Sequence, residues 1–379
     1  MSACRFAGQT AQARFVSGRC AARFGRAMKI LVTGGAGFIG GNFVYHLLRG
    51  HPEDVVVCAD KLTYAGDQDT LAEAFRSPQF VFYRADIAKK RDMEIVFGRE
   101  RPDAVVNFAA ESHVDRSVRS PSVFLRTNVL GVQVLLGACL KYNVPRFHQI
   151  STDEVYGDLP LEGGGAFSEN SPLRPSSPYA ASKAAADLLA LSYRRTYGLN
   201  VTVSRCSNNY GRFQFPEKLI PLAIARTLAG KPVPVYGTGK NVRDWIAAED
   251  HCAAIDLILR KGKSGSVYNV GARAEKSNLE LLEAVFAALG GGKIEFVKDR
   301  AGHDLRYAVD PSKIESELGW RAKITFAEGI RKTAAWYLSE RNWLENIENG
   351  TYKESALRRF PANVPVRLVP GQGGQGEVT

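Results

Sequence analysis

The chain has 379 residues, 45% of them hydrophobic, which is enough for one large or two ordinary domains with a buried core. No apolar run approaches the roughly 18–20 residues of a membrane span, so we expect no membrane segment. Six scattered cysteines without a Cys-x-x-Cys pair indicate reduced thiols, and six histidines without ligand spacing predict no metal site. The net charge of +11 suits a substrate with phosphates; without a basic helix or an aromatic platform, we expect no nucleic-acid binding.

Residues 1–27 contain five arginines and no acidic residue. This composition is typical of a mitochondrial-type transit segment, but it also fits an unstructured leader. Met28 stands directly before the first predicted strand, at 29–32, which favours the leader and a cytoplasmic protein.

The segment that follows Met28 has the pattern of a dinucleotide-binding turn. The strand at 29–32 runs into the glycines Gly34, Gly37 and Gly40, and an amphipathic helix follows. Such glycines let the backbone turn and approach a pyrophosphate at the helix N-terminus. A second predicted strand ends in Asp60, which can accept hydrogen bonds from ribose hydroxyls and repel a 2′-phosphate. The pattern therefore favours NAD over NADP, although Lys61 next to Asp60 weakens the distinction; a strand-turn-helix without ligand is the alternative.

Strands and helices continue to alternate as far as residue 211. The predicted elements are strands at 55–59, 80–83, 104–108, 147–150 and 200–204 and a long helix at about 123–142. This alternation predicts a doubly wound, parallel α/β sheet over residues 28–211.

The stretch from Ser151 to Lys183 holds the candidate catalytic residues. Tyr179 and Lys183 lie four residues apart, after a helix-start signal, and therefore share one face of a helix. We expect the lysine ammonium to favour the ionised phenol, which could then take a proton from an alcohol. Thr152 can hydrogen-bond the same alcohol, while the adjacent carboxyls of Asp153 and Glu154 add a proton donor and a proton acceptor.

A second Tyr-x-x-x-Lys pattern occurs at Tyr236 and Lys240, but two intervening glycines argue against a helix there. Beyond residue 211 the alternation breaks, and Arg243, the run from Asp299 to His303, and Tyr307 stand in loop-like settings. Arginines suit phosphates and aromatic rings suit a base, so residues 212–355 predict mainly a smaller substrate-binding domain, with some segments returning to the sheet. Each arginine could equally be a solvated surface charge. Residues 356–379 are rich in Pro and Gly and predict a mobile tail.

With these motifs assembled, the chain resembles the extended short-chain dehydrogenase/reductase family, and within it the nucleotide-sugar 4,6-dehydratases, from about Met28 to Tyr352. The motifs are TGGAGFIG, NFAAESHVDRS, STDEVYG, YAASK, RCSNNYG, EKLIP, RDW and DRAGHDLRY. The Asp153–Glu154 pair discriminates, because similar epimerases usually lack it and related decarboxylases carry Ser-Glu there.

The resemblance implies a Rossmann-type fold, bound NAD, and a homodimer formed by helices such as 123–142 and 179–197. It implies cofactor contacts at Gly34, Gly37, Phe38, Ile39, Gly40, Asp60, Lys61, Leu62, Thr63, Asp86, Ile87, Ala109, Ala110, Ser112, Thr127, Tyr179, Lys183 and Asn209. It implies substrate contacts at His113, Thr152, Asn208, Lys218, Leu219, Pro234, Tyr236, Arg243, Asn278, Asp299, Arg300, His303 and Tyr307.

The implied reaction is a lyase reaction on dTDP-glucose. Tyr179 and Lys183 support oxidation at C4, Glu154 removes the C5 proton, protonated Asp153 assists departure of the 6-hydroxyl, and the hydride returns to C6. UDP- or CDP-glucose as the substrate, a 4-epimerase, and an NAD-binding redox sensor without turnover are the alternatives. Intact Tyr179, Lys183 and Glu154 argue against the last.

Overall fold

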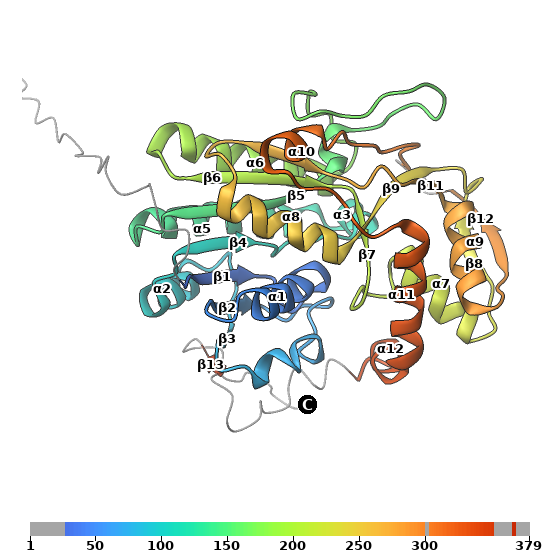
Figure 1. Ribbon diagram of the computed structural model, residues 1–379, viewed down its shortest axis with the longest axis horizontal. Helices are drawn as coiled ribbons and strands as arrows, with labels where there is room; N and C mark the ends of the chain where they lie inside the picture. The colour runs from blue at the N-terminus through green and yellow to red at the C-terminus, as the bar shows by residue number, and fades with distance from the viewer. Residues whose placement is uncertain (1–26, 300–302, 352–365, 369–379) are drawn as a thin grey trace, which may run out of the picture.

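The computed structural model describes residues 27–299, 303–351 and 366–368. Its main element is a sheet of eight strands in the order β10-β6-β5-β4-β1-β2-β3-β13, in which every neighbouring pair is parallel (Figure 1). The strands are β1 Lys29–Thr33, β2 Val55–Asp60, β3 Phe80–Arg84, β4 Ala104–Asn107, β5 Arg146–Thr152, β6 Val201–Cys206, β10 Val267–Val270 and β13 Val366–Leu368. The predicted doubly wound α/β fold is confirmed.

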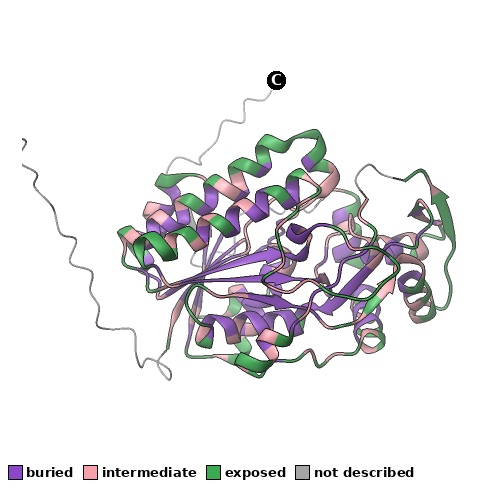
Figure 2. Cartoon of the chain, turned by 90° about the horizontal axis from the view of Figure 1, so that it is seen from above, coloured by how far each residue is buried: buried purple, intermediate pink, exposed green. Residues whose placement is uncertain are grey.

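Helices cover both faces of this sheet, so its strands are buried on both sides (Figure 2). Alternate residues of β1 show this, because Leu31 packs in one hydrophobic cluster while Ile30 and Val32 pack in the other. The first cluster includes side chains of α2 Lys90–Glu100, α5 Gly131–Lys141 and α6 Pro178–Tyr197; the second includes side chains of α1 Phe38–Gly50 and α8 Ala248–Lys261.

The chain reverses its direction of winding between β1 and β4. After β3 it crosses to β4, on the other side of β1. Ligands of open parallel sheets bind at such a switch point, outside the carboxyl ends of the strands. The first glycine loop and the strand ends near Ala109 and Thr152 are therefore brought to one edge.

A smaller unit follows β6 and stands beside the carboxyl end of the sheet (Figure 1). It contains β7 Asn208–Tyr210, α7 Leu219–Leu228, β8 Val233–Tyr236, β9 Val242–Ala247, β11 Glu275–Ser277, α9 Asn278–Leu289, β12 Ile294–Val297, α11 Phe326–Ser339 and α12 Arg341–Glu348. Between these segments the chain returns to the large sheet through α8, β10 and α10 Ser312–Leu318.

The start of α6 follows from its sequence. Ser177 is the N-cap residue, and its side chain accepts a hydrogen bond from the backbone N–H of Ala180, while Pro178 occupies the first turn. Gly198 ends the helix with a φ of 73°. By contrast, Gly237 and Gly239 have φ values of 57° and 69° after Tyr236, so the second Tyr-x-x-x-Lys pattern forms a turn, as predicted.

Two features differ from the sequence-based expectations. The continuous helical stretch 121–141, made of α4 Pro121–Phe124, the π-helical turn η3 Leu125–Leu130 and α5, is long and apolar enough to cross a membrane, yet 44% of its apolar window is buried. Its Asn128 bonds Glu111 and Ser182, so it packs as a covering helix of the sheet. In the tail, β13 pairs with β3, because the free edge of β3 offers backbone partners to a short extended segment. Residues 1–26, 352–365 and 369–379 lie outside the described residues, so the leader and the mobile tail stay predictions there.

Candidate active site

The glycine loop between β1 and α1 is shaped for close backbone approach. Gly34 has a φ of 72°, and a Cβ there would lie 2.6 Å from the backbone nitrogen of Ala109. A Cβ on Gly40 would lie 2.2 Å from the carbonyl oxygen of Gly34. Gly37 is the N-cap residue of α1, and no side chain caps this N-terminus. The loop thus leaves a helix N-terminus available to a pyrophosphate.

Asp60 is buried at the end of β2 beside this loop. Its carboxylate accepts hydrogen bonds from the backbone N–H groups of Ala36, at 3.0 Å, and Leu62, at 2.8 Å. Burial raises the pKa of Asp60. Lys61 points to Asp86, with 3.0 Å between Nζ and Oδ2. These contacts hold a carboxylate where a ribose would lie and place Lys61 away from it, which fits NAD.

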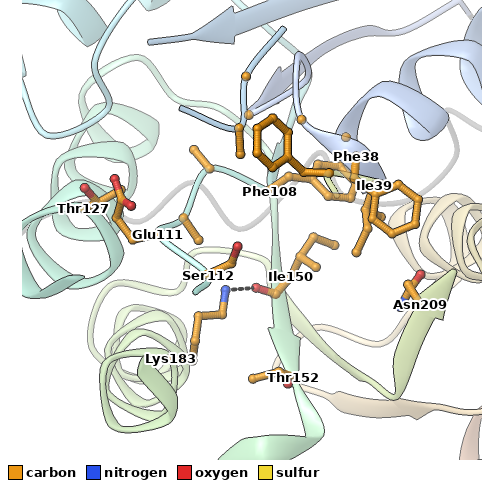
Figure 3. Close-up of a pocket in the computed structure, with 18 of the residues that line it drawn as sticks. Phe38, Ile39, Phe108, Glu111, Ser112, Thr127, Ile150, Thr152, Lys183 and Asn209 are labelled. Carbon is orange, nitrogen blue, oxygen red and sulfur yellow. Dashed lines mark hydrogen bonds between the residues drawn. The ribbon is translucent and has the colours of Figure 1, made fainter. Parts of the chain in front are cut away.

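Tyr179 and Lys183 lie on one face of α6 and line the same cleft. The Nζ of Lys183 donates to the carbonyl oxygen of Ile150 at 2.6 Å, shown by the dashed line in Figure 3. The Thr152 side chain stands near the Tyr179 hydroxyl and acts to lower the pKa of the phenol. The predicted lowering of the phenol pKa is not seen in the protein alone. Burial, followed by the charge of Glu154, raises the pKa of Tyr179 well above its usual value, and burial lowers the pKa of Lys183.

Asp153 and Glu154 continue from the end of β5 into the 3₁₀ turn η4 Asp153–Tyr156. The Thr152 hydroxyl donates to Oδ1 of Asp153 at 3.2 Å, while Oδ2 of Asp153 is buried without a hydrogen-bond partner among the described residues. Burial, then the charge of Glu154, raises the pKa of Asp153 to about 8. A neutral carboxyl at pH 7 can donate a proton, as the sequence analysis requires of this residue.

A buried network supports the floor of the cleft behind Lys183. Asp187, one helical turn further along α6, accepts hydrogen bonds from Ser151 Oγ, at 3.0 Å, and Arg205 Nε, at 2.9 Å. Arg205 also donates to the Tyr156 hydroxyl at 3.0 Å. The charge of Asp187 opposes the lowering of the Lys183 pKa by burial. The network therefore helps to keep the lysine protonated.

The predicted residues fall into two groups in the structure. One cleft is lined by all the predicted catalytic residues and by every predicted cofactor residue except Leu62 (Figure 3 shows part of it). Two further predicted substrate residues, Asn208 and Lys218, line the same cleft. Leu62 meets Asp60 through its backbone N–H. The following predicted substrate residues lie outside the lining of this cleft: His113, Leu219, Pro234, Tyr236, Arg243, Asn278, Asp299, His303 and Tyr307; Arg300 is outside the described residues.

Five residues of the second group lie on α7, β8, β9 and α9 of the smaller unit: Leu219, Pro234, Tyr236, Arg243 and Asn278. The guanidinium of Arg243 lies 4.3 Å from the centre of the Tyr307 ring and donates to backbone carbonyls of Val242, Asp304 and Leu305. The Tyr236 and His303 rings lie edge to face, 6.5 Å apart.

His113, a predicted substrate contact, lies outside the cleft lining and has partners within the chain. It caps α3 Val114–Arg119, accepts a hydrogen bond from the Arg116 N–H, and faces Glu217 at 3.7 Å. Burial lowers its pKa.

Sequence reasoning missed several residues that line the cleft. Glu217 accepts a hydrogen bond from the Tyr64 hydroxyl at 3.2 Å and stands beside Lys218, whose Nζ donates to Ser112 O at 3.3 Å. The EKLIP motif contains Glu217, so the motif carried a signal. The others are Ala59, Ala65, Gly66, Ala85, Phe108, Glu111, Ile150, Ser151, Cys206, Ser207, Gln214 and Phe215.

The fold and the cleft define an NAD-binding enzyme of the extended short-chain dehydrogenase/reductase type. The sequence model described as GDP-mannose 4,6 dehydratase matches residues 31–333, and the chain belongs to this family. A dTDP-glucose 4,6-dehydratase of Shigella flexneri is 47% identical, with 86% of this chain and 97% of that protein covered.

Solved structures agree with this membership. The dTDP-glucose 4,6-dehydratase DesIV of Streptomyces venezuelae, solved with NAD and dTDP bound, has a TM-score of 0.81 and 47% identity, covering 84% of this chain and all of DesIV. A UDP-glucose 4-epimerase of Thermus thermophilus, solved with NAD, has a TM-score of 0.77 and 34% identity, covering 83% of this chain and 100% of the epimerase.

Proposed function

We propose that the chain dehydrates dTDP-glucose to dTDP-4-keto-6-deoxy-glucose and uses NAD as a bound cofactor. The observation that carries the proposal is the buried Asp153 carboxyl, which is protonated near neutral pH and shares a cleft with Glu154, Tyr179 and Lys183. A 4-epimerase needs no proton donor for a leaving hydroxyl, so this carboxyl favours the dehydratase.

The cleft fits NAD at its dinucleotide end, where the uncapped α1 N-terminus and Asp60 would hold the pyrophosphate and a ribose. Bound there, NAD would supply a hydride acceptor for C4 of the sugar and a hydride donor for C6. Its positive ring would also offset the effects that raise the Tyr179 pKa.

The chain's own residues carry the protons. Tyr179, next to Thr152, takes the proton of the 4-hydroxyl, and Lys183, whose Nζ donates to Ile150 O, places a positive charge nearby. The resulting 4-ketone makes the C5 hydrogen acidic. Glu154 then removes the C5 proton, and Asp153 gives its proton to the departing 6-hydroxyl. Water leaves, the hydride is added at C6 and a proton returns to C5, so the product has one oxygen and two hydrogens fewer than the substrate.

The nucleotide would extend from the cleft toward the smaller unit. Arg243, Tyr236 and His303 provide a guanidinium and rings there, suited to phosphates and a base. The distinction between dTDP-, UDP- and CDP-glucose depends on these side chains.

We further propose a cytoplasmic homodimer. The helical stretch 121–141 and α6 carry exposed leucines: Leu125, Leu130 and Leu188 are 54%, 57% and 59% exposed. The turn η3 and α6 pack against each other, and exposed apolar side chains that gather on one face mark an interaction surface. The relatives named above are bacterial enzymes, which supports the cytoplasmic setting.

The proposal is tested by incubating the purified chain with dTDP-, UDP- and CDP-glucose and separating the products by chromatography. We expect the 4-keto-6-deoxy product from dTDP-glucose. A 4-epimer, or no product from any of the three, would refute the proposal. Product only from UDP- or CDP-glucose would keep the dehydratase activity but change the nucleobase of the substrate.

A further inference from the structure

Two histidines and an aspartate meet between α1 and α8, away from the cleft. His46 lies on α1, His51 follows its last residue, and Asp256 lies on α8. The Nε2 atoms of His51 and His46 lie 2.7 Å and 3.5 Å from the same Asp256 oxygen, Oδ2. Their potential ligand atoms all lie within 4.8 Å of one another.

The packing of the two helices arranges this cluster. Leu47 of α1 and Ile255 and Leu259 of α8 belong to one buried cluster, so the helix surfaces are fixed against each other. His51 leaves the helix with φ −137° and ψ 71°, and its ring returns to the side where His46 stands. The third residue is 205 positions away in the chain, which explains why histidine spacing alone predicts no metal site.

Arg260 fixes the orientation of the carboxylate. Its Nε binds Oδ1 of Asp256 at 2.7 Å, and another of its nitrogens binds Asp54. Oδ2 is thereby left to the two imidazoles. With neutral imidazoles, Asp54, Asp256 and Arg260 together carry a net charge of −1, which favours a cation.

The geometry suits a tetrahedral ion. Ligand atoms about 2.0–2.1 Å from a tetrahedral zinc are separated by roughly 3.3–3.4 Å. The 3.5 Å between His46 Nε2 and Asp256 Oδ2 is close to this separation. The 2.7 Å between His51 Nε2 and Asp256 Oδ2 is a hydrogen-bond distance, so the His51 ring would move outward by about 0.6 Å to bind an ion. Imidazole nitrogen and carboxylate oxygen are suitable ligands for Zn²⁺ and Co²⁺. The side chains of His46, His51 and Asp256 are 28%, 32% and 13% exposed, so an ion can enter and water can complete its coordination.

We propose that His46, His51 and Asp256 bind one divalent transition-metal ion, best matched by Zn²⁺, which ties the C-terminal end of α1 to α8. The 13 residues of α1 separate this end from the glycine loop by roughly 20 Å. The ion therefore stabilises the helix pair and takes no part in the proposed reaction at the cleft.

The test uses the full chain without an affinity tag, treated with a chelator and titrated with Co²⁺ and then Zn²⁺. We expect one Co²⁺ per chain, visible d–d bands without a thiolate charge-transfer band, displacement by Zn²⁺, and a higher Tm with Zn²⁺. The double variant His46→Gln/His51→Gln keeps donors toward Asp256 but loses both nitrogen ligands. Loss of groups that only hydrogen-bond to metal ligands weakens metal binding by roughly 10–100-fold. Loss of two ligands should therefore weaken Co²⁺ binding by at least this factor.

His303→Gln is the matched control, because this histidine lies in the smaller unit and its loss should leave Co²⁺ binding unchanged. Circular dichroism and dTDP-glucose turnover, expected at the wild-type level, report whether the double variant is folded; if it is not, His46→Gln alone replaces it. Failure to bind Co²⁺, equal affinity in the folded variant, or a thiolate band that places the ion at cysteines would overturn the proposal.

Discussion

Glu154 stands next to Asp153, and its charge is second only to burial in raising the pKa of Asp153 to about 8. Burial, aided by the charge of Glu154, thus keeps Asp153 protonated, which separates the two carboxyls into an acid and a base. We expect the elimination rate to fall as the pH rises through about 8. Asp153→Asn should lower turnover by roughly 10²–10⁴-fold and remove this pH dependence. A turnover–pH profile checks both; an unchanged profile in the variant would exclude Asp153 as the acid.

The raised pKa of Asp153 also makes the stability of the folded protein depend on pH. The Asp153 pKa is raised from 3.8, so the folded protein holds this proton more tightly than the unfolded chain does. Its stabilising contribution is complete below pH about 4 and is lost as the pH rises to about 8. Because Asp153→Asn stays neutral, its Tm relative to wild type should increase across this range, measured by thermal unfolding at several pH values.

Glu154→Gln should separate the first oxidation from the elimination. Tyr179 and Lys183 remain intact, so C4 oxidation proceeds, but no base removes the C5 proton. We expect absorbance of the reduced cofactor to accumulate on the enzyme while product formation falls by roughly 10²–10⁴-fold. Tyr179→Phe is the matched control and should show neither signal. Product released by Glu154→Gln at the wild-type rate would mean that another group is the base.

Gly40→Ala should weaken NAD binding and lower the Tm, because the added Cβ would lie 2.2 Å from the Gly34 carbonyl oxygen. Gly50→Ala, at the other end of α1, is the control, since beyond its own stretch of helix no heavy atom would lie within 4 Å of the added Cβ. Cofactor content after gel filtration and thermal unfolding should distinguish the two. Equal NAD content in both variants would show that the loop tolerates the extra atom.

Leu130→Glu and Leu188→Glu should convert a dimer into monomers, because each places a charge on the exposed apolar surface of the 121–141 stretch and α6. Phe296→Glu, at an equally exposed position on β12, should leave the dimer intact. Light scattering after gel filtration gives the mass. A monomeric wild-type protein, or dimers in all variants, would contradict the assignment.

Local spacing was sufficient to predict the parts of the site that lie on one turn or one helix. Gly34 to Gly40, Thr152 to Glu154, and Tyr179 with Lys183 are such parts, and all reach the same cleft. Gln214 and Cys206 line the cleft only because segments distant in the sequence fold together, so residue spacing could not predict their place there. The prediction of a lowered phenol pKa for Tyr179 was wrong for a related reason. In the folded protein, burial and the charge of Glu154 raise this pKa by more than the lysine could lower it.

The most direct measurement follows deuterium from C4 of dTDP-glucose by NMR of the product. Transfer of the C4 hydrogen within one active site predicts deuterium at C6 of a 4-keto-6-deoxy sugar, with one solvent hydrogen at C5. Deuterium that stays at C4 in an intact hexose, or that appears only in solvent, would contradict dehydration by Tyr179, Glu154 and Asp153.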